Sequence, residues 1–162
     1  MDEPATARIE RALCLLGRSA ERFGALSRDD SNPVMDRAAY RLLGQLYDNG
    51  PARLTALGAT FSLDISTVSR QVAALTAHRL VERTVDPTDR RAIIIRLTDY
   101  GRERYESARR ARVHAIADLT REWKPEEVEQ LAGLLCRLNA AIEDRGRRLR
   151  RQAAAAPEQP AS

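Results

Sequence analysis

The hydrophobic residues at the start of the chain recur every three or four positions, which is the spacing of one face of an α-helix. Over residues 5–26 this face carries Ile9, Leu13, Leu16, Ala20 and Phe23. The following segment, 27–33, is polar and ends in an Asn-Pro pair, which breaks a helical pattern. We therefore predict a first helix over 5–26 that a connecting segment separates from the next element.

A second helical pattern begins after Asp36, whose carboxylate is suited to capping a helix start. The pattern runs to Asp48 and stops at the Asn-Gly-Pro sequence of residues 49–51. Its apolar side carries Leu42, Leu43 and Leu46. The sequence thus predicts a helix with one face in a hydrophobic core.

Two shorter helices follow in quick succession, over residues 55–61 and from Asp64 to Ala77, with Ser62-Leu63 as the turn. In the second of these the apolar residues are Val68, Val72 and Leu75, which share one face. The outward positions of its first two turns are then polar. They are Ser66, Thr67, Ser69, Arg70 and Gln71.

The residue pattern changes from helical spacing to two β-prone runs, 80–85 and 92–97. They flank the polar turn 86–91 and predict a β-hairpin. Thr98 or Asp99 is suited to cap the next helix, which we expect to end near Trp123. Pro125, followed by two glutamates, marks a further helix start. We expect that helix to end near Arg145, and the arginine-rich run after it to lead into alanine, proline and glutamine residues that are disordered.

The element order predicts a mainly α fold with a small β-hairpin wing, a winged helix-turn-helix flanked by N- and C-terminal helices. We assign residues 1–33 and 99–146 to dimerisation, 34–98 to the winged module and 147–162 to a basic, then disordered, tail. The outer helices carry apolar stripes that the small module cannot cover completely, which favours a homodimer. A helical cap within one chain is the alternative.

Composition narrows the classes of function without selecting one. A chain of 162 residues fits one compact module, and no 18-residue apolar run predicts a membrane helix. The acidic start Met1-Asp2-Glu3-Pro4 does not resemble a secretory signal, so we expect a cytoplasmic protein. The net charge of +4 permits nucleic-acid binding but does not demonstrate it. Among the 27 lysines and arginines, Lys124 is the sole lysine. The predominance of arginine suits phosphate and guanine contacts, but codon bias also explains it.

The predicted second helix of the helix-turn-helix has the chemistry of a recognition helix in a major groove. Arg70 can bind guanine or a phosphate, and the short hydroxyls allow close approach to bases and backbone. The hairpin tip presents Arg90 and Arg91, which suit a narrow minor groove, and the carboxylate of Asp89 can hold one guanidinium extended. These residues predict a partner in double-stranded DNA.

Four short motifs together resemble the MarR family of transcription regulators. They are STVSR at 66–70, LVER at 80–83, DPTDRR at 86–91 and LTDYG at 97–101. The resemblance covers roughly residues 5–145 and implies a dimer whose first and last helices intertwine. It also implies that Asp89 and Arg91 position the wing tip at DNA, and it favours repression. The family often has glycine where this chain has Arg79, which leaves the turn from helix to wing open.

The resemblance further implies a cleft for small aromatic or phenolic ligands, for which the candidate lining residues are Tyr40, Leu43, Tyr47 and Trp123. Apolar residues at helical spacing are more often core, so packing is the competing interpretation. Some relatives sense hydroperoxides through a cysteine near Cys14, but among leucines a cysteine also behaves as a small hydrophobe.

No phosphate loop, nucleophile elbow or zinc-protease motif supports an enzyme, and we expect no cofactor. His78 and His114 lack metal-ligand spacing with each other or with either cysteine, so we expect no metal site. The sequence thus predicts a homodimeric, ligand-released repressor on a pseudo-palindromic operator with half-sites ~34–36 Å apart. The alternatives are a redox sensor using Cys14 and a winged helix used for protein contacts.

Overall fold

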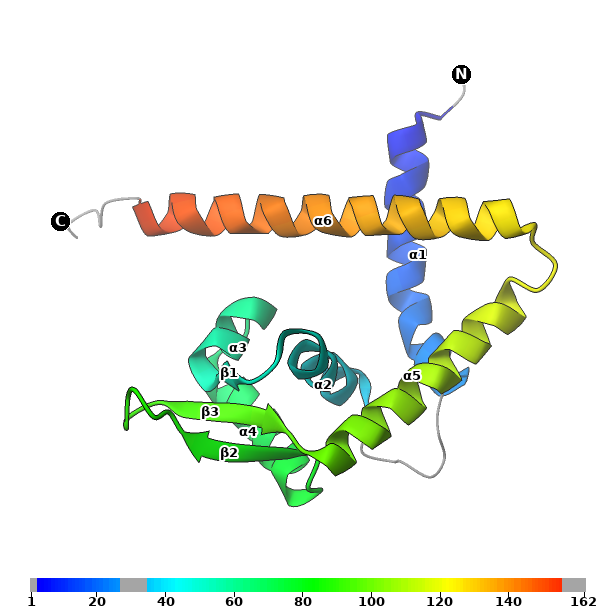
Figure 1. Ribbon diagram of the computed structural model, residues 1–162. Helices are drawn as coiled ribbons and strands as arrows, with labels where there is room; N and C mark the ends of the chain where they lie inside the picture. Colours follow the sequence, from blue (N-terminus) through cyan, green and yellow to red (C-terminus); the bar gives the residue numbers. More distant parts are fainter. Residues whose placement is uncertain (1–2, 27–34, 156–162) are drawn as a thin grey trace. The chain divides into compact units, whose positions relative to one another are not determined.

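The described residues form helices and a small antiparallel sheet (Figure 1). The computed structural model describes residues 3–26 and 35–155. In chain order the elements are α1 (Ala5–Leu26), α2 (Arg37–Asn49), β1 (Ala52–Arg53), α3 (Leu54–Phe61), α4 (Ile65–Ala77), β2 (Val81–Val85), β3 (Ile93–Leu97), α5 (Asp99–Leu119) and α6 (Pro125–Ala155). This confirms the predicted class, a mainly helical winged helix-turn-helix with a hairpin wing. The predicted connecting segment 27–33 lies outside the described residues.

The chain divides into two compact units, Met1–Asp118 and Leu119–Ser162. Among the described residues, the first unit contains the sheet and the helices up to α5, and the second contains α6. α1 begins and ends where its hydrophobic spacing predicted, yet Ile9, Leu13 and Leu16 of its apolar face are exposed. No helix in the described ranges is long and apolar enough to cross a membrane.

The helix-turn-helix forms as the sequence predicted, with one difference at its turn. α2 begins at its Asp36 cap, which accepts a hydrogen bond from the backbone N–H of Ala39 at 2.7 Å. Ser62 ends α3 in the left-handed conformation, with φ 52°. Asp64 occupies the N-cap position of α4, but its side chain does not make the capping hydrogen bond that we expected. The helix start therefore depends on the turn backbone rather than on this carboxylate.

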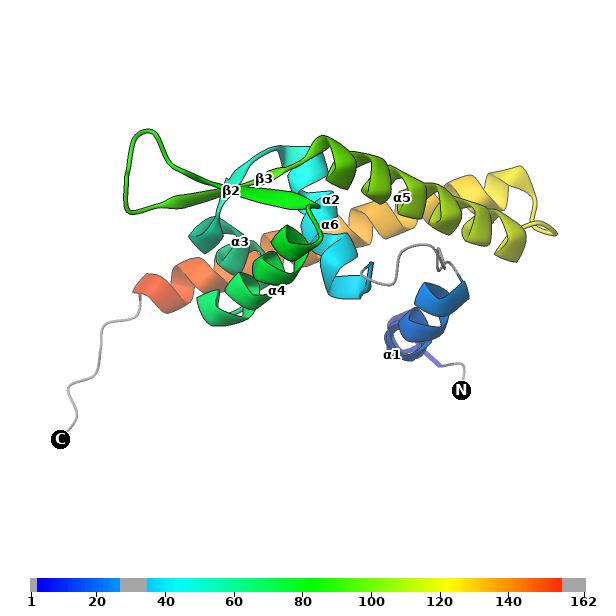
Figure 2. The ribbon, with the colours of Figure 1, turned by 90° about the horizontal axis from the view of Figure 1, so that it is seen from below.

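The sheet contains three strands in the order β1-β3-β2, and all neighbours are antiparallel. β2 and β3 form the predicted hairpin, in which Val81 lies opposite Leu97 and Val85 opposite Ile93. The loop between them projects away from the helices of the module, as Figure 2 shows. The sequence did not predict β1, because two residues are too few to display the alternation that identifies a strand.

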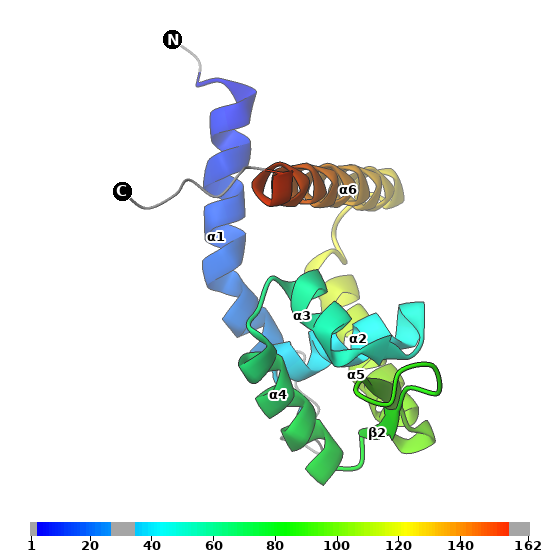
Figure 3. The ribbon, with the colours of Figure 1, turned by 90° about the vertical axis from the view of Figure 1, so that its left-hand side faces the viewer.

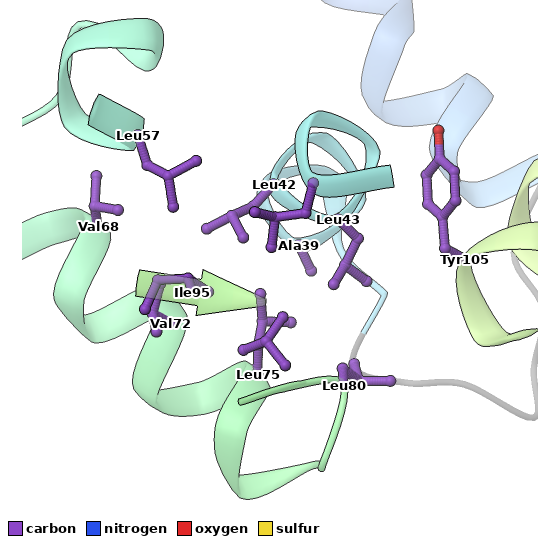
Figure 4. Packing of buried hydrophobic residues seen from close by; sticks show 12 residues of the cluster. Ala39, Leu42, Leu43, Leu57, Val68, Val72, Leu75, Leu80, Ile95 and Tyr105 are labelled. Atoms are coloured by element: carbon purple, nitrogen blue, oxygen red, sulfur yellow. The ribbon is translucent and has the colours of Figure 1, made fainter. Parts of the chain in front are cut away.

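The core of the winged module lies where α2, α3, α4 and β3 converge (Figure 4). Its most completely buried side chains are Leu42, Leu43, Leu57, Leu75, Leu80, Ile95, Val68, Val72 and Val81. Each such side chain contributes about 1.5–3 kcal/mol relative to an exposed position. The core therefore fixes α4 with its apolar face inward and its polar face toward solvent.

α4 ends in a Schellman motif, which gives the conformation of the turn from α4 to the wing that the sequence left open at Arg79. The backbone N–H of Arg79 donates to Thr76 at 2.9 Å, and that of Leu80 donates to Leu75 at 2.9 Å. Both leucines are buried, which supplies the apolar contact typical of this motif. Arg79 adopts φ 58°, so a left-handed conformation that suits glycine best is adopted here by a residue with a side chain.

We expect Arg79→Gly to raise the free energy of unfolding by about 0.5–1 kcal/mol. Glycine relieves the steric cost of the left-handed conformation, and this gain exceeds the extra entropy that it gives the unfolded chain. Urea denaturation at fixed protein concentration measures the change. Arg79→Ala is the control, because it removes the guanidinium but keeps the Cβ; equal stability of the two variants would contradict the prediction.

The last two helices differ from the prediction at their ends. α5 stops at Leu119 rather than near Trp123, because the chain turns there and the backbone N–H of Trp123 donates to Thr120 at 2.9 Å. α6 starts at Pro125 as predicted. Glu127 reaches back to the backbone N–H of Lys124 at 2.9 Å, which is half of a capping box.

The tail prediction is wrong for the segment up to Ala155, which continues α6. Arg147 and Arg148 form ion pairs one helical turn back, with Glu143 and Asp144. Such pairs and the alanines beyond them favour a helix locally. A prediction based only on the polar composition of the segment overlooks them. The remaining residues, 156–162, lie outside the described part.

Candidate nucleic-acid interface

α4 presents the polar surface that the sequence predicted. Ser66 and Arg70 are exposed, and the other three candidates, Thr67, Ser69 and Gln71, are half-buried. The guanidinium of Arg70 donates one long hydrogen bond, of 3.4 Å, to the hydroxyl of Thr67, so its other N–H groups remain to bind a partner. Figure 3 shows α3 and α4 next to each other with the wing loop to one side of both.

The wing loop is organised around Asp86, whose role was not predicted from the sequence. Its carboxylate accepts hydrogen bonds from the backbone N–H of Thr88 at 2.8 Å and from the Thr88 hydroxyl at 2.7 Å. Arg53, in β1, donates from Nε at 2.8 Å and forms an ion pair from Nη2 at 2.7 Å. The hydrogen bonds from Thr88, and then the guanidinium of Arg53, lower the pKa of Asp86 from about 3.8 to about 2. This carboxylate is therefore ionised at neutral pH although it is buried.

Asp89 shapes the tip of the loop through the backbone. Its carboxylate accepts a hydrogen bond from the backbone N–H of Arg91 at 3.1 Å, whereas the sequence predicted that it would hold a guanidinium. This is the local turn that aspartate commonly forms with the residue two positions on. Arg90 and Arg91 are exposed, and in the part of the chain that the structure describes no carboxylate pairs with either guanidinium. Both are available to an anionic partner.

The predicted ligand residues of α2 belong to an aromatic cluster and to the core. The rings of Tyr40 and Tyr47 each lie 5.0 Å from that of Tyr105, a residue that was not among the predicted ligand residues. The Tyr47 hydroxyl donates to Glu106 at 2.9 Å, and burial together with Tyr40 raises the pKa of Tyr105. Leu43 is fully buried and packs in the core of the module.

The fourth predicted ligand residue and the hollow that the structure shows do not coincide with this cluster. Trp123 belongs to the second unit, where it is 47% exposed. A hollow of about 350 Å³ opens between the start of α2 and α4. Its lining comprises Asp36, Ala38, Ala39, Gln71, Ala74, Leu75 and His78, which are not the predicted ligand residues. The ligand assignment of Tyr40, Tyr47 and Trp123 stays a prediction.

Cys14 is exposed on α1, and its thiol donates to the Glu10 carboxylate at 3.0 Å. That hydrogen bond raises the pKa of the thiol, which disfavours the thiolate that oxidation requires. Within residues 3–26 and 35–155, no three His, Cys, Asp or Glu side chains form a group that could hold a metal.

Comparison with known proteins identifies the chain. A sequence profile of the MarR family matches residues 35–92. The helix-turn-helix regulator YxaD of Bacillus subtilis is 39% identical over 110 residues, 68% of this chain and 77% of that protein. The repressor NicR of Pseudomonas putida is 31% identical over 88 residues, 54% of this chain and 56% of that protein. A MarR family protein from Bacillus stearothermophilus has the same fold, with a TM-score of 0.75 at 21% identity over 88% of this chain and 99% of that one.

The helix-turn-helix, its polar outer face and the wing define a winged-helix transcription regulator that binds DNA. The chain belongs to the MarR family, a class of regulators rather than of enzymes.

Proposed function

We propose that the protein is a homodimeric repressor that binds a pseudo-palindromic operator, with α4 in the major groove and the wing tip in the minor groove. The observation that carries this proposal is the presence, on one winged module, of a polar outer face on α4 and of two exposed wing-tip arginines that pair with no carboxylate among the described residues. Hydroxyl, amide and guanidinium groups suit base edges and phosphates, and a narrow minor groove attracts arginine.

Exposed apolar faces on the flanking helices support the dimer. They comprise Ile9, Leu13 and Leu16 on α1, Val113, Ile116 and Leu119 on α5, and Leu131, Leu134, Leu135 and Ile142 on α6. Apolar surface of this extent on a single chain is typical of an interface between subunits. A two-fold dimer then reads half-sites one helical turn apart, ~34–36 Å.

Repression and release by a small molecule complete the proposal. NicR, which this chain resembles, is named a repressor. The hollow between α2 and α4 offers a place where a small ligand would contact Gln71, a side chain of the polar face of α4. Such a ligand shifts the protein away from DNA only by binding the DNA-free conformation more tightly. Titration of phenolic compounds against the protein–DNA complex tests this step.

The decisive experiment is a binding titration against the DNA upstream of the protein's own gene, beside an unrelated duplex, at two salt concentrations. We expect a preference of ~10³ or more for the first duplex and a steep dependence on salt. Equal, weak binding to both duplexes would contradict the idea that the protein controls its own gene. If duplexes selected from a random pool also bound no better than the unrelated one, that result would favour a winged helix used for protein contacts.

On the preferred duplex, we expect Arg91→Ala to weaken binding by ~1–3 kcal/mol while the dimer stays intact. Arg70→Ala is expected to weaken binding and also to relax sequence preference, because this side chain projects from the polar face of α4. Arg121→Ala is the charge-matched control, since Arg121 lies outside the winged module. If Arg91→Ala weakened DNA binding no more than Arg121→Ala does, the wing assignment would be contradicted. If Arg70→Ala weakened binding to all sequences equally, Arg70 would be a phosphate contact.

A further inference from the structure

A side chain of the short strand β1 reaches the wing loop from the far edge of the sheet. Arg53 lies in β1, opposite Ile94 of β3, and reaches past that strand to the end of β2. Its Nε and Nη2 atoms lie 2.8 Å and 2.7 Å from the same oxygen, Oδ2 of Asp86. The Asp86 side chain is only 7% exposed and that of Arg53 is 46% exposed, so the carboxylate is shielded from solvent while the guanidinium stays partly open to it.

The other carboxylate oxygen of Asp86 fixes the start of the wing loop. Oδ1 accepts from the backbone N–H and the hydroxyl of Thr88, and the Arg53 Nη2 atom lies 3.4 Å from that hydroxyl. The backbone of Asp86 also closes the hairpin, because its N–H donates to Ala92 at 3.0 Å and its carbonyl accepts from Asp89 at 3.3 Å. One residue thus joins β1, both sides of the loop and Thr88. We call Arg53, Asp86 and Thr88 the wing clamp.

Beyond the wing clamp, the hydrogen bonds that order the tip carrying Arg90 and Arg91 are, among the described residues, local ones within the loop. A projecting two-stranded segment is marginally ordered by itself, so its direction depends on how its base is held. A tip that is already oriented in the free protein loses less entropy when it binds.

We propose that Arg53 is a positioning residue for DNA binding, which holds the wing through Asp86 and Thr88 so that Arg90 and Arg91 meet the duplex in one orientation. The inference rests on the proposed mode of DNA binding. It differs from a direct role for Arg53 because Nε and Nη2 are both engaged by Asp86, and because the pair carries no net charge to attract a phosphate.

A double-mutant cycle on the selected duplex tests the coupling between Arg53 and Arg91. We expect Arg53→Ala alone to weaken binding about tenfold, and Arg91→Ala alone to do so to a similar degree. The double variant is expected to lose clearly less than the two single losses combined, because a wing without Arg91 gains less from being positioned. Circular dichroism and sedimentation check that each variant is folded and dimeric at the assay temperature. If Arg53→Ala is not folded, Arg53→Lys is used in its place.

A second arm tests the direction of the effect at Asp86. Removing a negative charge near DNA tightens binding if charge alone acts. The wing clamp requires the opposite, so we expect Asp86→Asn to weaken binding. Glu82→Gln is the matched control, since Glu82 is an exposed carboxylate on β2 that contacts Arg96 across the hairpin and takes no part in the wing clamp. We expect this control to bind as well as the wild type or slightly better.

The outcomes separate this inference from the function on which it rests. Specific binding by the wild type, with additive losses in the cycle or with tighter binding by Asp86→Asn, would overturn the positioning role alone. A decrease of about 1 in the salt slope for Arg53→Ala, together with additivity, would identify Arg53 as a phosphate contact instead. If the wild type binds no duplex specifically, both the positioning role and the proposed function are overturned.

Discussion

Gly101→Ala is expected to lower the free energy of unfolding by about 3 kcal/mol, near the upper end of what an added methyl group costs in a packed site. A Cβ at this position would lie 1.9 Å from the carbonyl oxygen of Leu80 and 2.7 Å from its carbonyl carbon. Both atoms belong to the backbone, so no side-chain rotation relieves the clash. Urea denaturation followed by circular dichroism, at fixed protein concentration, measures the loss.

The surroundings of Gly101 explain why the backbone cannot move aside. The Leu80 carbonyl accepts from the backbone N–H and from the hydroxyl of Thr98, each at 3.2 Å. The same hydroxyl accepts from the N–H of Gly101 at 2.9 Å and thereby caps α5. Displacing α5 from Leu80 would therefore break the cap and the end of the hairpin together.

Gly133→Ala is the control for the intrinsic effect of the substitution. Gly133 lies in α6, two residues from both Leu131 and Leu135 and so across the helix from them. Apart from the backbone of its own helix, no atom would lie within 4 Å of a Cβ added there. Alanine is expected to stabilise the helix by roughly 0.5–1 kcal/mol at this position, because glycine loses more backbone entropy on folding. A similar gain at Gly101 would contradict the close packing of α5 against Leu80.

The LTDYG motif thus has a physical basis that its letters alone did not reveal. In the sequence, Gly101 served only as a mark of resemblance, and Thr98 and Asp99 were alternative caps. The structure assigns the cap to Thr98 and gives the glycine a steric reason.

Helix limits were predictable where the chain carries local chemical signals. Asp36 caps α2 as expected, and the Asn-Gly-Pro sequence ends it. The outward face of α4 was also predictable, because helical periodicity alone decides which residues Val68, Val72 and Leu75 leave outside the core. At the end of α6 the prediction overlooked local signals, because ion pairs and alanines extend the helix beyond Arg145.

The wing clamp could not be predicted, because its partners meet only in the folded sheet. Arg53 and Asp86 are 33 positions apart, and β1 is too short to be seen in the hydrophobic pattern. The loop sequence offered nearer arginines, Arg90 and Arg91, as partners for its carboxylates. Asp89 instead binds backbone and Asp86 binds an arginine of another strand, which leaves the tip arginines unpaired.

Leu43→Ala is expected to lower the free energy of unfolding by about 2–5 kcal/mol, the range found when a buried leucine is truncated and a cavity remains. Leu43 is 0% exposed and packs in the core of the winged module beside Leu42 and Leu75 (Figure 4). Thermal and urea denaturation, again at fixed concentration because a dimer is expected, measure the change.

The competing interpretation, in which Leu43 lines a ligand cleft, predicts a different pattern. An accessible cleft residue loses little buried area when truncated, so Leu43→Ala would leave stability nearly unchanged and alter ligand response instead. Tyr47→Phe provides the comparison on the same helix, because it removes only the hydroxyl that donates to Glu106. That loss is expected to cost about 0.5–1.5 kcal/mol. A smaller loss for Leu43→Ala than for Tyr47→Phe would contradict the core assignment and return Leu43 to the ligand candidates.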